Sequence, residues 1–512
     1  MSDFTDVIVI GSGFGGAISA SRITEAGIKV KLIERGPWRD SLPVQSMGIK
    51  NRAPFPTGWA HLTHLVRTLR NSKIPGGRMT LNKKGFMELH VGKGLNVICS
   101  SNVGGGSHIY SGLNVKPPAP GYWDGVADGL SDDTMDPHYQ RVFDRMQSTV
   151  PEPRHVRQSV QERFKGTLDT APEIDQIQMG LLFADDLDNP KEVVTEDGVT
   201  RREATLGEDG NLGSPGGGKA TLDFMYLARA MKQGLEILDQ REALTVRKAP
   251  ADAPGRYRVN LENHYTGEFE SHYANNVIVA AGTLNTLHLL LRSRDVKDGL
   301  GGMPRLGQRF GGNGDFFGYW NLNDRTQDLT KSNPVRSLLR LQEDDNPLSN
   351  RPTPMIAEGA LPSPDDLPIP RWLKNKFRRG SFVAGMGPDA QDGTVTLENG
   401  KLKIDYKPEN SPIFDDIKDT MDGVSEKTGK KLYYIQRPTS VHPTGGACIG
   451  RSLDEGVVDS NGEVFGHPGL YVADAAALPN PVGGPPAMTI AAWADHLAEQ
   501  FIAKFQAAEA AQ

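Results

Sequence analysis

The sequence predicts an α/β chain, α+β overall, in which a mostly parallel nucleotide-binding domain is joined to a second domain built on an antiparallel sheet. Three observations support this fold class. A strand, a glycine-rich turn, a helix and a second strand follow one another between Asp6 and Gly36. A similar strand, turn and helix recur at residues 276–291, and short alternating apolar runs dominate residues 316–440. The length of 512 residues also exceeds one ordinary hydrophobic core.

The opening unit has the residue types that bind a pyrophosphate. Residues 6–10 and 29–33 are apolar, β-branched runs, which are typical of buried parallel strands. The glycines between them permit, in order, a tight turn, the approach of a phosphate and close helix packing: Gly11, Gly13 and Gly16. Glu34 ends the second strand, where an acid can hydrogen-bond a ribose diol. The unit therefore predicts a Rossmann-type dinucleotide site, and a glycine-rich turn without a ligand is the alternative.

A second glycine cluster follows near residue 100. It consists of Gly104, Gly105, Gly106 and Ser107, and it lacks the strand and helix order of a Rossmann turn. Its consecutive backbone N–H groups can bind phosphate or a flavin. We assign these four residues to cofactor binding, with a flexible loop as the alternative.

The second strand–turn–helix unit has Gly282 at its turn, and it is predicted to add a strand to the first sheet and to place this glycine at the cofactor. Helices are predicted elsewhere at residues 59–69, 136–146, 222–231, 413–429 and 485–504. Antiparallel strands are predicted at residues 241–261, 268–272, 355–358, 382–386, 394–397 and 402–405.

The order of these elements divides the chain into alternating segments. The cofactor-binding domain is assigned to residues 1–120, 211–315 and 441–512. The substrate domain is assigned to residues 121–210 and 316–440. The substrate cavity is expected to be lined by residues 120–210 and 316–440.

Composition excludes several classes of partner. The net charge is -6 and no strongly basic segment stands out, so nucleic acid is not an expected partner. No apolar run approaches the roughly 20 residues of a membrane span. The nucleotide motif begins within ten residues of the first residue, so no signal peptide and a cytoplasmic location are expected. The two cysteines, Cys99 and Cys448, are expected to be buried thiols, with a single disulfide as the alternative.

Six motifs, in order along the whole chain, resemble the flavin-dependent glucose-methanol-choline oxidoreductases, and within them the cholesterol-oxidase-like branch. They are GSGFGG with Glu34, VGGGS at 103–107, VIVAAGTLNTLHLLLRS from Val277, LGQRFGGNGD at 306–315, HPTGGACIG from His442, and GLYVADAAALP before the last helix.

This resemblance implies FAD as the cofactor. Gly11, Gly13 and Gly16 would meet its pyrophosphate, Glu34 its adenosine ribose, and the 104–107 loop its pyrophosphate and flavin. Asp474 would approach the ribityl or diphosphate region. The segment that would border the isoalloxazine contains Pro486, Met488 and Thr489. Some members of the family hold FAD covalently through a histidine just after the glycine loop, but Ile109 rather than His108 falls on that position, so non-covalent FAD is expected.

The resemblance also implies that His442 is catalytic. In the family this histidine hydrogen-bonds the substrate hydroxyl beside flavin N5 and helps to remove its proton while hydride moves to the flavin. Taken alone, a histidine is more often structural or solvated.

The chain departs from the family at the partner of this histidine. The family normally places Asn or a second His there, whereas this sequence has Pro485, which has neither a side-chain donor nor a backbone N–H. Tyr110 stands where cholesterol oxidases often carry Asn, and its hydroxyl can donate and accept, so we include it as a catalytic candidate. Glu358 resembles the acid that shuttles a proton in steroid double-bond isomerisation, and a solvated strand carboxylate is the alternative.

These residues predict an FAD-dependent oxidoreductase that oxidises a hydroxyl group of a bulky apolar substrate, such as a sterol, terpenoid or alicyclic alcohol, by hydride transfer to flavin N5. A small apolar alcohol or ketone, and oxygen or another electron acceptor, are the expected partners, and no metal site is assigned. One alternative, indicated by Pro485, is a C–C dehydrogenase, a ketone-acting enzyme, or a lyase or light-driven enzyme. The other is a redox-inactive flavin-binding protein, which would have no need of His442.

Overall fold

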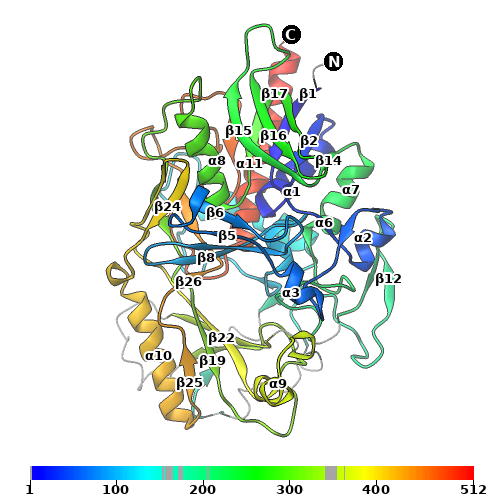
Figure 1. Cartoon of the computed structure of the whole chain (residues 1–512), viewed down its shortest axis with the longest axis vertical. Coiled ribbons are helices and arrows are strands. Elements are labelled where there is room, and N and C mark those ends of the chain that lie inside the picture. Colours follow the sequence, from blue (N-terminus) through cyan, green and yellow to red (C-terminus); the bar gives the residue numbers. More distant parts are fainter. Residues whose placement is uncertain are drawn as a thin grey trace.

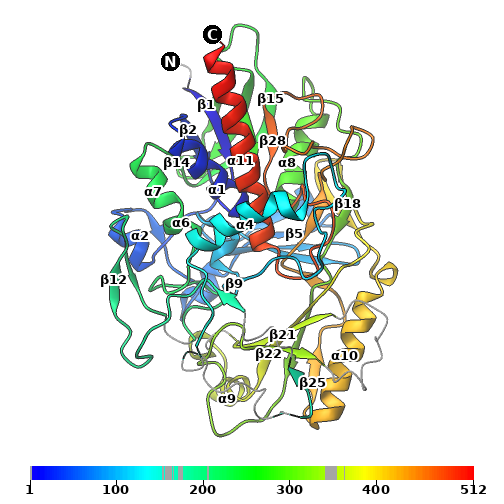
Figure 2. The same cartoon turned by 180° about the vertical axis from the view of Figure 1, so that it is seen from behind.

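The computed structural model describes residues 3–152, 155, 164, 166–170, 177–204, 207–340, 354–361 and 364–511. Figures 1 and 2 show an elongated molecule in which both termini lie at one end, beside a large sheet. A second sheet, with helices α9 (Arg371–Arg378) and α10 (Ile413–Thr428), lies at the opposite end. A third sheet crosses the middle of the molecule, between the other two (Figure 1).

Seven strands form the sheet beside the termini, in the order β14-β2-β1-β17-β16-β15, and β28 pairs with the end of β17. The parallel strands are β14 (Glu236–Leu238), β2 (Val30–Ile33), β1 (Asp3–Ile10), β17 (Phe269–Val279) and β28 (Leu470–Val472). The antiparallel edge consists of β16 (Tyr257–Asn263) and β15 (Arg241–Lys248). This sheet confirms the predicted α/β fold class and the strand added near residue 276.

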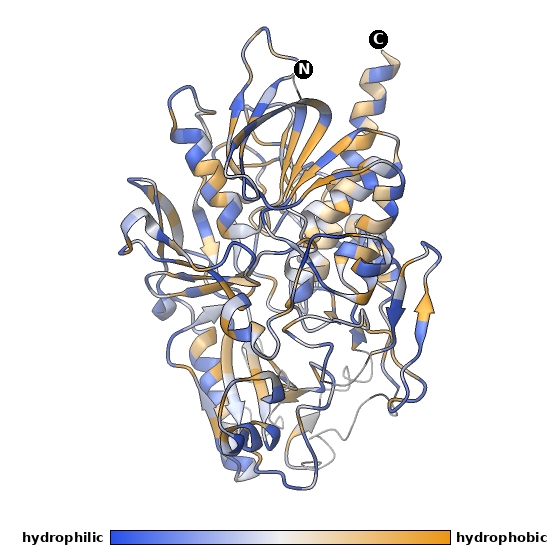
Figure 3. Ribbon diagram, turned by 45° about the vertical axis from the view of Figure 1, so that its right-hand side comes forward, coloured by the Kyte–Doolittle hydropathy of each residue, from blue (hydrophilic) through white to orange (hydrophobic). Residues whose placement is uncertain are grey.

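Buried β-branched residues form the centre of this sheet. Val7, Ile8 and Val9 of β1 and Val277 and Ile278 of β17 are fully buried, and Figure 3 shows the central strands as hydrophobic between their covering helices. Helix α1 (Phe14–Glu25) packs against α11 (Ala487–Ala510), while α8 (Thr283–Asp295) packs against β15. Burial on both faces explains why these strands read as continuous apolar runs.

The sheet at the opposite end has six antiparallel strands, in the order β10-β20-β21-β22-β19-β25. They are β10 (Asp169–Thr170), β20 (Ser337–Arg340), β21 (Met355–Gly359), β22 (Ser381–Met386), β19 (Phe316–Trp320) and β25 (Leu432–Tyr434). The strands expected at residues 355–358 and 382–386 are therefore neighbours in one sheet, whereas β23 (Thr394–Glu398) and β24 (Lys401–Asp405) form a separate hairpin.

The central five-stranded sheet was not predicted. Its order is β26-β8-β7-β5-β6, with β26 (Thr439–Ser440), β8 (Asn96–Ser100), β7 (Met87–Val91), β5 (Val66–Arg70) and β6 (Arg78–Thr80). The helix predicted at residues 59–69 is wrong beyond its first half, because α3 (Ala60–His64) ends early and β5 follows it. The β-branched Val66 and Thr68 fit a strand, and Thr68 pairs with Thr80 of β6 and with Glu88 of β7.

The other predicted helices are present with changed bounds. The helix expected at 136–146 is α4 (Asp132–Arg145), which begins earlier because Ser131 caps it together with Thr134. The helix expected at 222–231 is split at Tyr226 into α6 (Leu222–Met225) and α7 (Leu227–Lys232). The short remaining elements are α2 (Leu42–Ser46), β3 (Trp38–Arg39), β4 (Arg52–Ala53), β9 (Leu113–Asn114), β11 (Gln178–Met179), β12 (Glu192–Val194), β13 (Thr200–Arg202), β18 (Gln308–Gly311) and β27 (Thr444–Gly446).

The sequence predicts no membrane-spanning segment, and two buried thiols with a single disulfide as the alternative. None of the helices in the described ranges combines the length and apolarity that a membrane crossing needs. Cys99 and Cys448 are both free, so the disulfide alternative is wrong.

Within the first βαβ unit, Gly16 is the glycine at which an added Cβ would come closest to other atoms. A Cβ at this position would lie 1.8 Å from the carbonyl oxygen of Gly11 and 3.3 Å from a methyl carbon of Val9. We expect Gly16→Ala to push α1 away from β1 and to cost at least about 1–3 kcal/mol of unfolding free energy, as overpacking does. Urea denaturation measures this cost. Gly210→Ala is the matched control, because an added Cβ there meets nothing within 4 Å; equal midpoints for the two variants would contradict the prediction.

Candidate active site

One cavity of about 1470 Å³ occupies the region between the three sheets. Its lining includes the Gly11–Gly15 turn and Glu34 from the first sheet, and His442, Pro485 and Glu358 from segments hundreds of residues away. Pockets for one drug-sized ligand are about 300–1,000 Å³. The cavity therefore has room for a dinucleotide and a second molecule in one continuous space.

The two glycine clusters face each other at the floor of this cavity. A Cβ on Gly105 would lie 2.5 Å from the Cα of Gly13, and a Cβ on Gly11 would lie 2.1 Å from the carbonyl oxygen of Ala280. Ser12 joins the clusters, because its hydroxyl contacts Glu34 at 2.7 Å and accepts from the Gly104 N–H at 3.0 Å. Main chain from both loops borders the cavity, at Gly11, Gly13 and Gly15 in the first and at Gly105 and Gly106 in the second. The N–H groups of Gly11, Gly104 and Gly105 already donate within the protein, to the Ile33 carbonyl, the Ser12 hydroxyl and the Asn102 carbonyl.

Glu34 is buried at the end of β2, as the motif predicts. Its Oε2 accepts from the N–H and the hydroxyl of Ser12, and its Oε1 accepts from the Gly36 N–H at 2.7 Å. Burial raises the pKa of Glu34, and these hydrogen bonds oppose that shift. A carboxylate has about four acceptor positions, so capacity remains for a ribose hydroxyl.

Asp474 connects two other edges of the cavity. Its carboxylate accepts from the Gly282 N–H at 2.8 Å, from the Thr286 hydroxyl at 2.5 Å and from the Ala476 N–H at 2.9 Å. The carboxylate therefore fixes the end of β28 against the start of α8, and burial raises the pKa of Asp474. Both Asp474 and Gly282 line the cavity, as the sequence assignment requires.

His442 lines the cavity between β26 and β27 and is held by Asp315. Its Nδ1 lies 2.9 Å from Asp315 Oδ1, while Asp315 Oδ2 accepts from the N–H groups of Val441 and His442 and contacts the Ser440 hydroxyl. Because the carboxylate accepts, Nδ1 carries the proton and neutral His442 keeps its lone pair on Nε2. This tautomer is the one that can take a proton from a hydroxyl in the cavity.

The segment opposite His442 is apolar where it meets the cavity. Pro485, Pro486 and Ala487 line it. Met488 and Thr489 are almost fully buried and do not line it, and Tyr139 donates a hydrogen bond to the Thr489 hydroxyl at 3.2 Å. The structure therefore brings Pro486 to the cavity and leaves the side chains of Met488 and Thr489 in the core.

Tyr110 lines the cavity, but its hydroxyl is already engaged. It donates to the carbonyl of Ala220 at 2.8 Å, and burial raises the pKa of Tyr110 above its ordinary value. Lys219 lies behind this loop and donates to the carbonyls of His108, Tyr110 and Gly210. Desolvation lowers the pKa of Lys219 to about 7. The ring of Tyr110, rather than its hydroxyl, is thus presented to a ligand.

His108 is directed away from the cavity. Its side chain is almost fully buried, its Nε2 lies 2.7 Å from the carbonyl oxygen of Val103, and it is absent from the cavity lining, whereas Ile109 is present. Cys99 borders the cavity, but burial raises the pKa of its thiol to about 12. The His108 side chain therefore does not reach the cavity, whereas Cys99 does.

Glu358 lies in β21 and contributes to the lining of one part of the cavity, which we call the apolar chamber. Its side chain is nevertheless fully buried and ion-paired with Arg336. The Arg336 guanidinium donates to its carboxylate and to the Ser381 hydroxyl, and the Ser337 hydroxyl donates to it at 3.2 Å. The remaining walls are apolar, with Leu113, Phe317, Val335, Ala357, Phe382, Ala384 and Met386 lining this part of the cavity. The alternative of a solvated carboxylate is wrong for Glu358, because an ion pair in an apolar wall encloses it.

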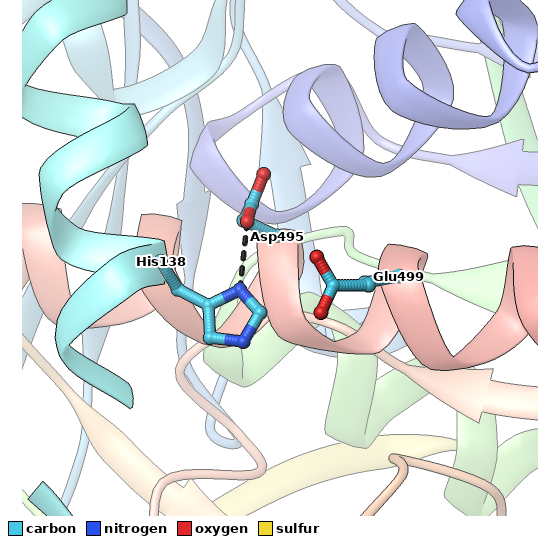
Figure 4. Close-up of side chains that lie close together, drawn as sticks. All are labelled: His138, Asp495 and Glu499. Carbon is cyan, nitrogen blue, oxygen red and sulfur yellow. Dashed lines mark hydrogen bonds and ion pairs between the residues drawn. The ribbon is translucent and has the colours of Figure 1, made fainter. Parts of the chain in front are cut away.

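The described part of the chain gathers two groups of side chains that resemble metal ligands. In the first, shown in Figure 4, His138 Nδ1 lies 2.7 Å from Asp495 Oδ2 beside Glu499. Arg22 and Arg141 pair with both carboxylates. The second group, Glu242 with Glu262 and His264, is paired with Arg35, Arg78 and Lys83. Cations already neutralise both groups, so they are ion-pair networks that connect helices and strands.

Sequence reasoning missed three residues of the site: Ser12, Asn102 and Asp315. Asn102 is fully buried and accepts from Arg39 Nε at 2.5 Å below the second glycine loop. Asp315 lies in the LGQRFGGNGD motif, directly before an apolar strand. A carboxylate between a glycine-rich turn and a strand could have indicated this residue, but its partner, His442, is 127 residues away in sequence.

Comparisons with known proteins agree with this geometry. Two family models, both described as GMC oxidoreductase, match residues 76–311 and 362–494. A cholesterol oxidase of Mycobacterium tuberculosis (strain ATCC 25618 / H37Rv) is 26% identical over 96% of this chain and 90% of its own length. A cholesterol oxidase of Acinetobacter baumannii is 23% identical over 98% of this chain and 94% of its own length.

Solved structures share the fold at lower identity. Pyridoxine 4-oxidase from Mesorbium loti has a TM-score of 0.61 and 16% identity, and the match covers 97% of this chain and 99% of that one. Formate oxidase from Aspergillus oryzae RIB40 has a TM-score of 0.62 and 14% identity, with 99% of each chain covered. These likenesses show the fold alone.

The Asp315–His442 contact predicts the tautomer of the histidine. In Asp315→Asn, an amide cannot accept from Nδ1–H and from three further donors at once, so we expect the proton of His442 to move to Nε2. Losing charge-assisted hydrogen bonds should also cost about 1.5–3 kcal/mol of stability. Nitrogen-15 NMR of the histidine ring reports the tautomer. Asp459→Asn is the control, since Asp459 holds a remote turn through the Asn461 and Glu463 N–H groups; an unchanged Nδ1–H signal in Asp315→Asn would refute the assignment.

Proposed function

The chain belongs to the GMC oxidoreductase family, and from this premise we propose that it oxidises a hydroxyl group on a bulky, largely apolar substrate such as a sterol, terpenoid or alicyclic alcohol. It is an FAD-dependent oxidoreductase, as the family is. The observation that carries the finer proposal is the single cavity that joins the glycine turns to His442 and to an apolar chamber.

The residues on the cavity floor fit FAD. Gly11, Gly13 and the 104–107 loop would lie along the pyrophosphate, and Glu34 would hold the adenosine ribose. Asp474 and Pro486 would lie along the ribityl and isoalloxazine parts. FAD bound in this way supplies a two-electron acceptor for hydride.

The chain itself would handle the proton and the orientation of the substrate. His442 Nε2 would accept the hydroxyl proton as the carbinol C–H bond breaks and a carbonyl forms. Asp315 would stabilise the imidazolium that results, because its carboxylate already accepts from Nδ1–H. The electrons would pass to oxygen or another acceptor.

The chamber supports a substrate with an apolar body. Val335, Ala357 and Met386 line it and belong to one buried cluster. Tyr110 would contribute its ring, and Glu358, held by Arg336, would contribute a wall rather than an exposed base. We keep the role of Glu358 in proton shuttling as a proposal of lower rank, because its carboxylate would first have to leave the guanidinium.

Pro485 supports a second candidate function. With no polar group on that side, a hydroxyl has one partner at His442 and loses a hydrogen bond worth about 1 kcal/mol. A ketone-acting enzyme, a C–C dehydrogenase or a non-redox relative would need fewer polar contacts from the Pro485 segment. We keep a cytoplasmic location within the proposal on the basis of the two free thiols.

The division into domains is also part of the proposal. Residues 1–120, 211–315 and 441–512 would form the cofactor-binding domain. Residues 121–210 and 316–440 would form the substrate domain, because the six-stranded sheet supplies the apolar chamber.

The direction of His108 predicts non-covalent FAD. Denaturing the purified yellow protein with acid should release FAD into the supernatant, because neither His108 nor Cys99 is presented as a nucleophile. Absorbance and mass spectrometry of supernatant and peptides measure the partition. Flavin that stays on a peptide would contradict non-covalent binding, and a colourless protein that binds NAD would contradict FAD itself.

The position of His442 predicts its contribution to alcohol oxidation. His442→Ala should keep FAD but slow anaerobic flavin reduction by alcohol by about 10²–10⁴-fold, which is typical of acid–base help. Stopped-flow absorbance against a panel of sterol, terpenoid and alicyclic alcohols and ketones, with mass spectrometry of products, measures it. His288→Ala is the control, since this histidine also lines the cavity. A rate within a few-fold of wild type, or bleaching by none of the alcohols, would argue for the second candidate.

A further inference from the structure

The turn Gly312–Asp315, between β18 and β19, contacts both walls of the reaction site. Asp315 holds His442 on one wall, as described above. Asn313, two residues earlier, holds the other wall: its Nδ2 donates to the carbonyl of Gly484 and its Oδ1 accepts from the Gly483 N–H, both at 2.8 Å. Gly484 directly precedes Pro485. One short turn therefore binds two segments that are about 40 residues apart in sequence and that both contribute lining residues to the cavity.

The residue type of Asn313 suits both its backbone and its partners. Its φ is 57°, in the left-handed region where asparagine is enriched among residues other than glycine. Its amide offers one acceptor and two donors, which match an N–H and a C=O from consecutive residues. The side chain is fully buried, so these two bonds are not exchanged with water.

Asp389 holds the same turn from behind. Its Oδ2 accepts from the Gly312 N–H at 2.6 Å and from the Tyr406 hydroxyl at 2.7 Å, and these two donors come from the turn itself and from the residue after β24. The charged and titratable groups that face it are Asp315 and Tyr406. Burial, followed by the charge of Asp315, raises the pKa of Asp389 to about 6 despite these donors.

Neither Asn313 nor Asp389 lines the cavity, so neither can touch a substrate there. We propose that the Gly312–Asp315 turn is a positioning element that sets the separation of His442 from the Pro485 wall, with Asn313 as its clamp and Asp389 as its anchor. The inference rests on the proposed role of His442 in the reaction. It adds two positioning residues, and it explains how a wall of two prolines is kept in place without N–H groups of its own.

The decisive variant is Asn313→Gly, because glycine tolerates the left-handed φ and removes only the amide. Hydrogen–deuterium exchange of peptides across residues 480–486 should rise, with and without FAD, since the Gly483 N–H loses its acceptor. The rate of flavin reduction at saturating alcohol should fall by about 10–100-fold, because small misplacements of reacting groups are costly. The acidic limb of the pH–rate profile should stay in place, because Asp315 still holds His442.

Asn399→Gly is the matched control. Asn399 also has a left-handed φ, of 50°, but it lies at the tip of the β23–β24 hairpin. Unchanged exchange at residues 480–486 in Asn313→Gly would overturn the clamp whatever the activity. Raised exchange with a wild-type rate would overturn positioning, provided that His442→Ala is slow. A silent His442→Ala would instead overturn the proposed function, while the exchange result still decides the clamp.

Asp389→Asn tests the anchor. Asparagine retains an acceptor for Gly312, so the fold should persist, but a negative charge near the Asp315–His442 pair is lost. Hydrogen–deuterium exchange of peptides across residues 311–316 should rise, because a neutral amide accepts from the Gly312 N–H more weakly than a carboxylate does. Asp459→Asn is the remote control. Unchanged exchange across residues 311–316 in Asp389→Asn would overturn the anchoring role.

Discussion

The approach of backbone to backbone at the glycine turns is the constraint on which the rest of the structure depends. Gly11 lies against Ala280 at the end of β17, and Gly105 lies against Gly13, so three segments far apart in sequence meet with no side chain between them. A single Cβ at Gly11 or Gly105 would overlap backbone atoms. Because these contacts consist of main chain, the floor of the cavity is bordered by backbone from two loops, as the proposed binding of a pyrophosphate there would require. The same contacts fix the end of the first sheet, and therefore the position of the cavity walls next to it.

Hydrogen bonds from buried side chains, rather than backbone contacts between glycines, hold the part of the cavity that contains His442 and Pro485. Here short loops meet without a regular ladder, and buried polar side chains supply the hydrogen bonds that strands supply elsewhere. Asp315 gathers three donors around the start of the His442 segment, while Asn313 gathers the peptides of Gly483 and Gly484. Pro485 and Pro486 have no N–H to donate, so the bonds of Asn313 to their neighbours add to the hydrogen bond that the Pro486 carbonyl accepts from the Ile490 N–H. The result is a site with one polar face, at His442, and one apolar face, at Pro485.

How much the sequence predicts depends on how local the determining interaction is. The first βαβ unit, α10 and the βα unit at Gly282 follow from patterns within 30 residues, and all three are present. The central sheet was missed because β5, β7 and β8 are short, and β7 is only partly buried on one face. The partners of His442 and Pro485 were missed because a hydrogen bond across more than 100 residues leaves no periodic signal. Met488 and Thr489 were assigned to the site from their motif, but they lie in the core. The packing of α11 directs their side chains inward, while Pro486 lines the cavity.

The apolar chamber contains one ion pair, and its physics bears on how a substrate would be oriented. Arg336 and Glu358 are fully buried, and their partners within the sheet are Ser337, Ser381 and backbone carbonyls. Removing one partner of such a pair leaves an uncompensated buried charge and typically costs about 3–5 kcal/mol. A pair satisfied in this way has little left to offer to a polar group on a ligand. Attraction along the chamber then comes from apolar contact with Val335, Ala357 and Met386, which is non-directional. An alcohol bound as proposed would therefore be oriented by the shape of the chamber and by its contact with His442, so the position of that histidine relative to the Pro485 segment would matter more than in a site with two polar partners.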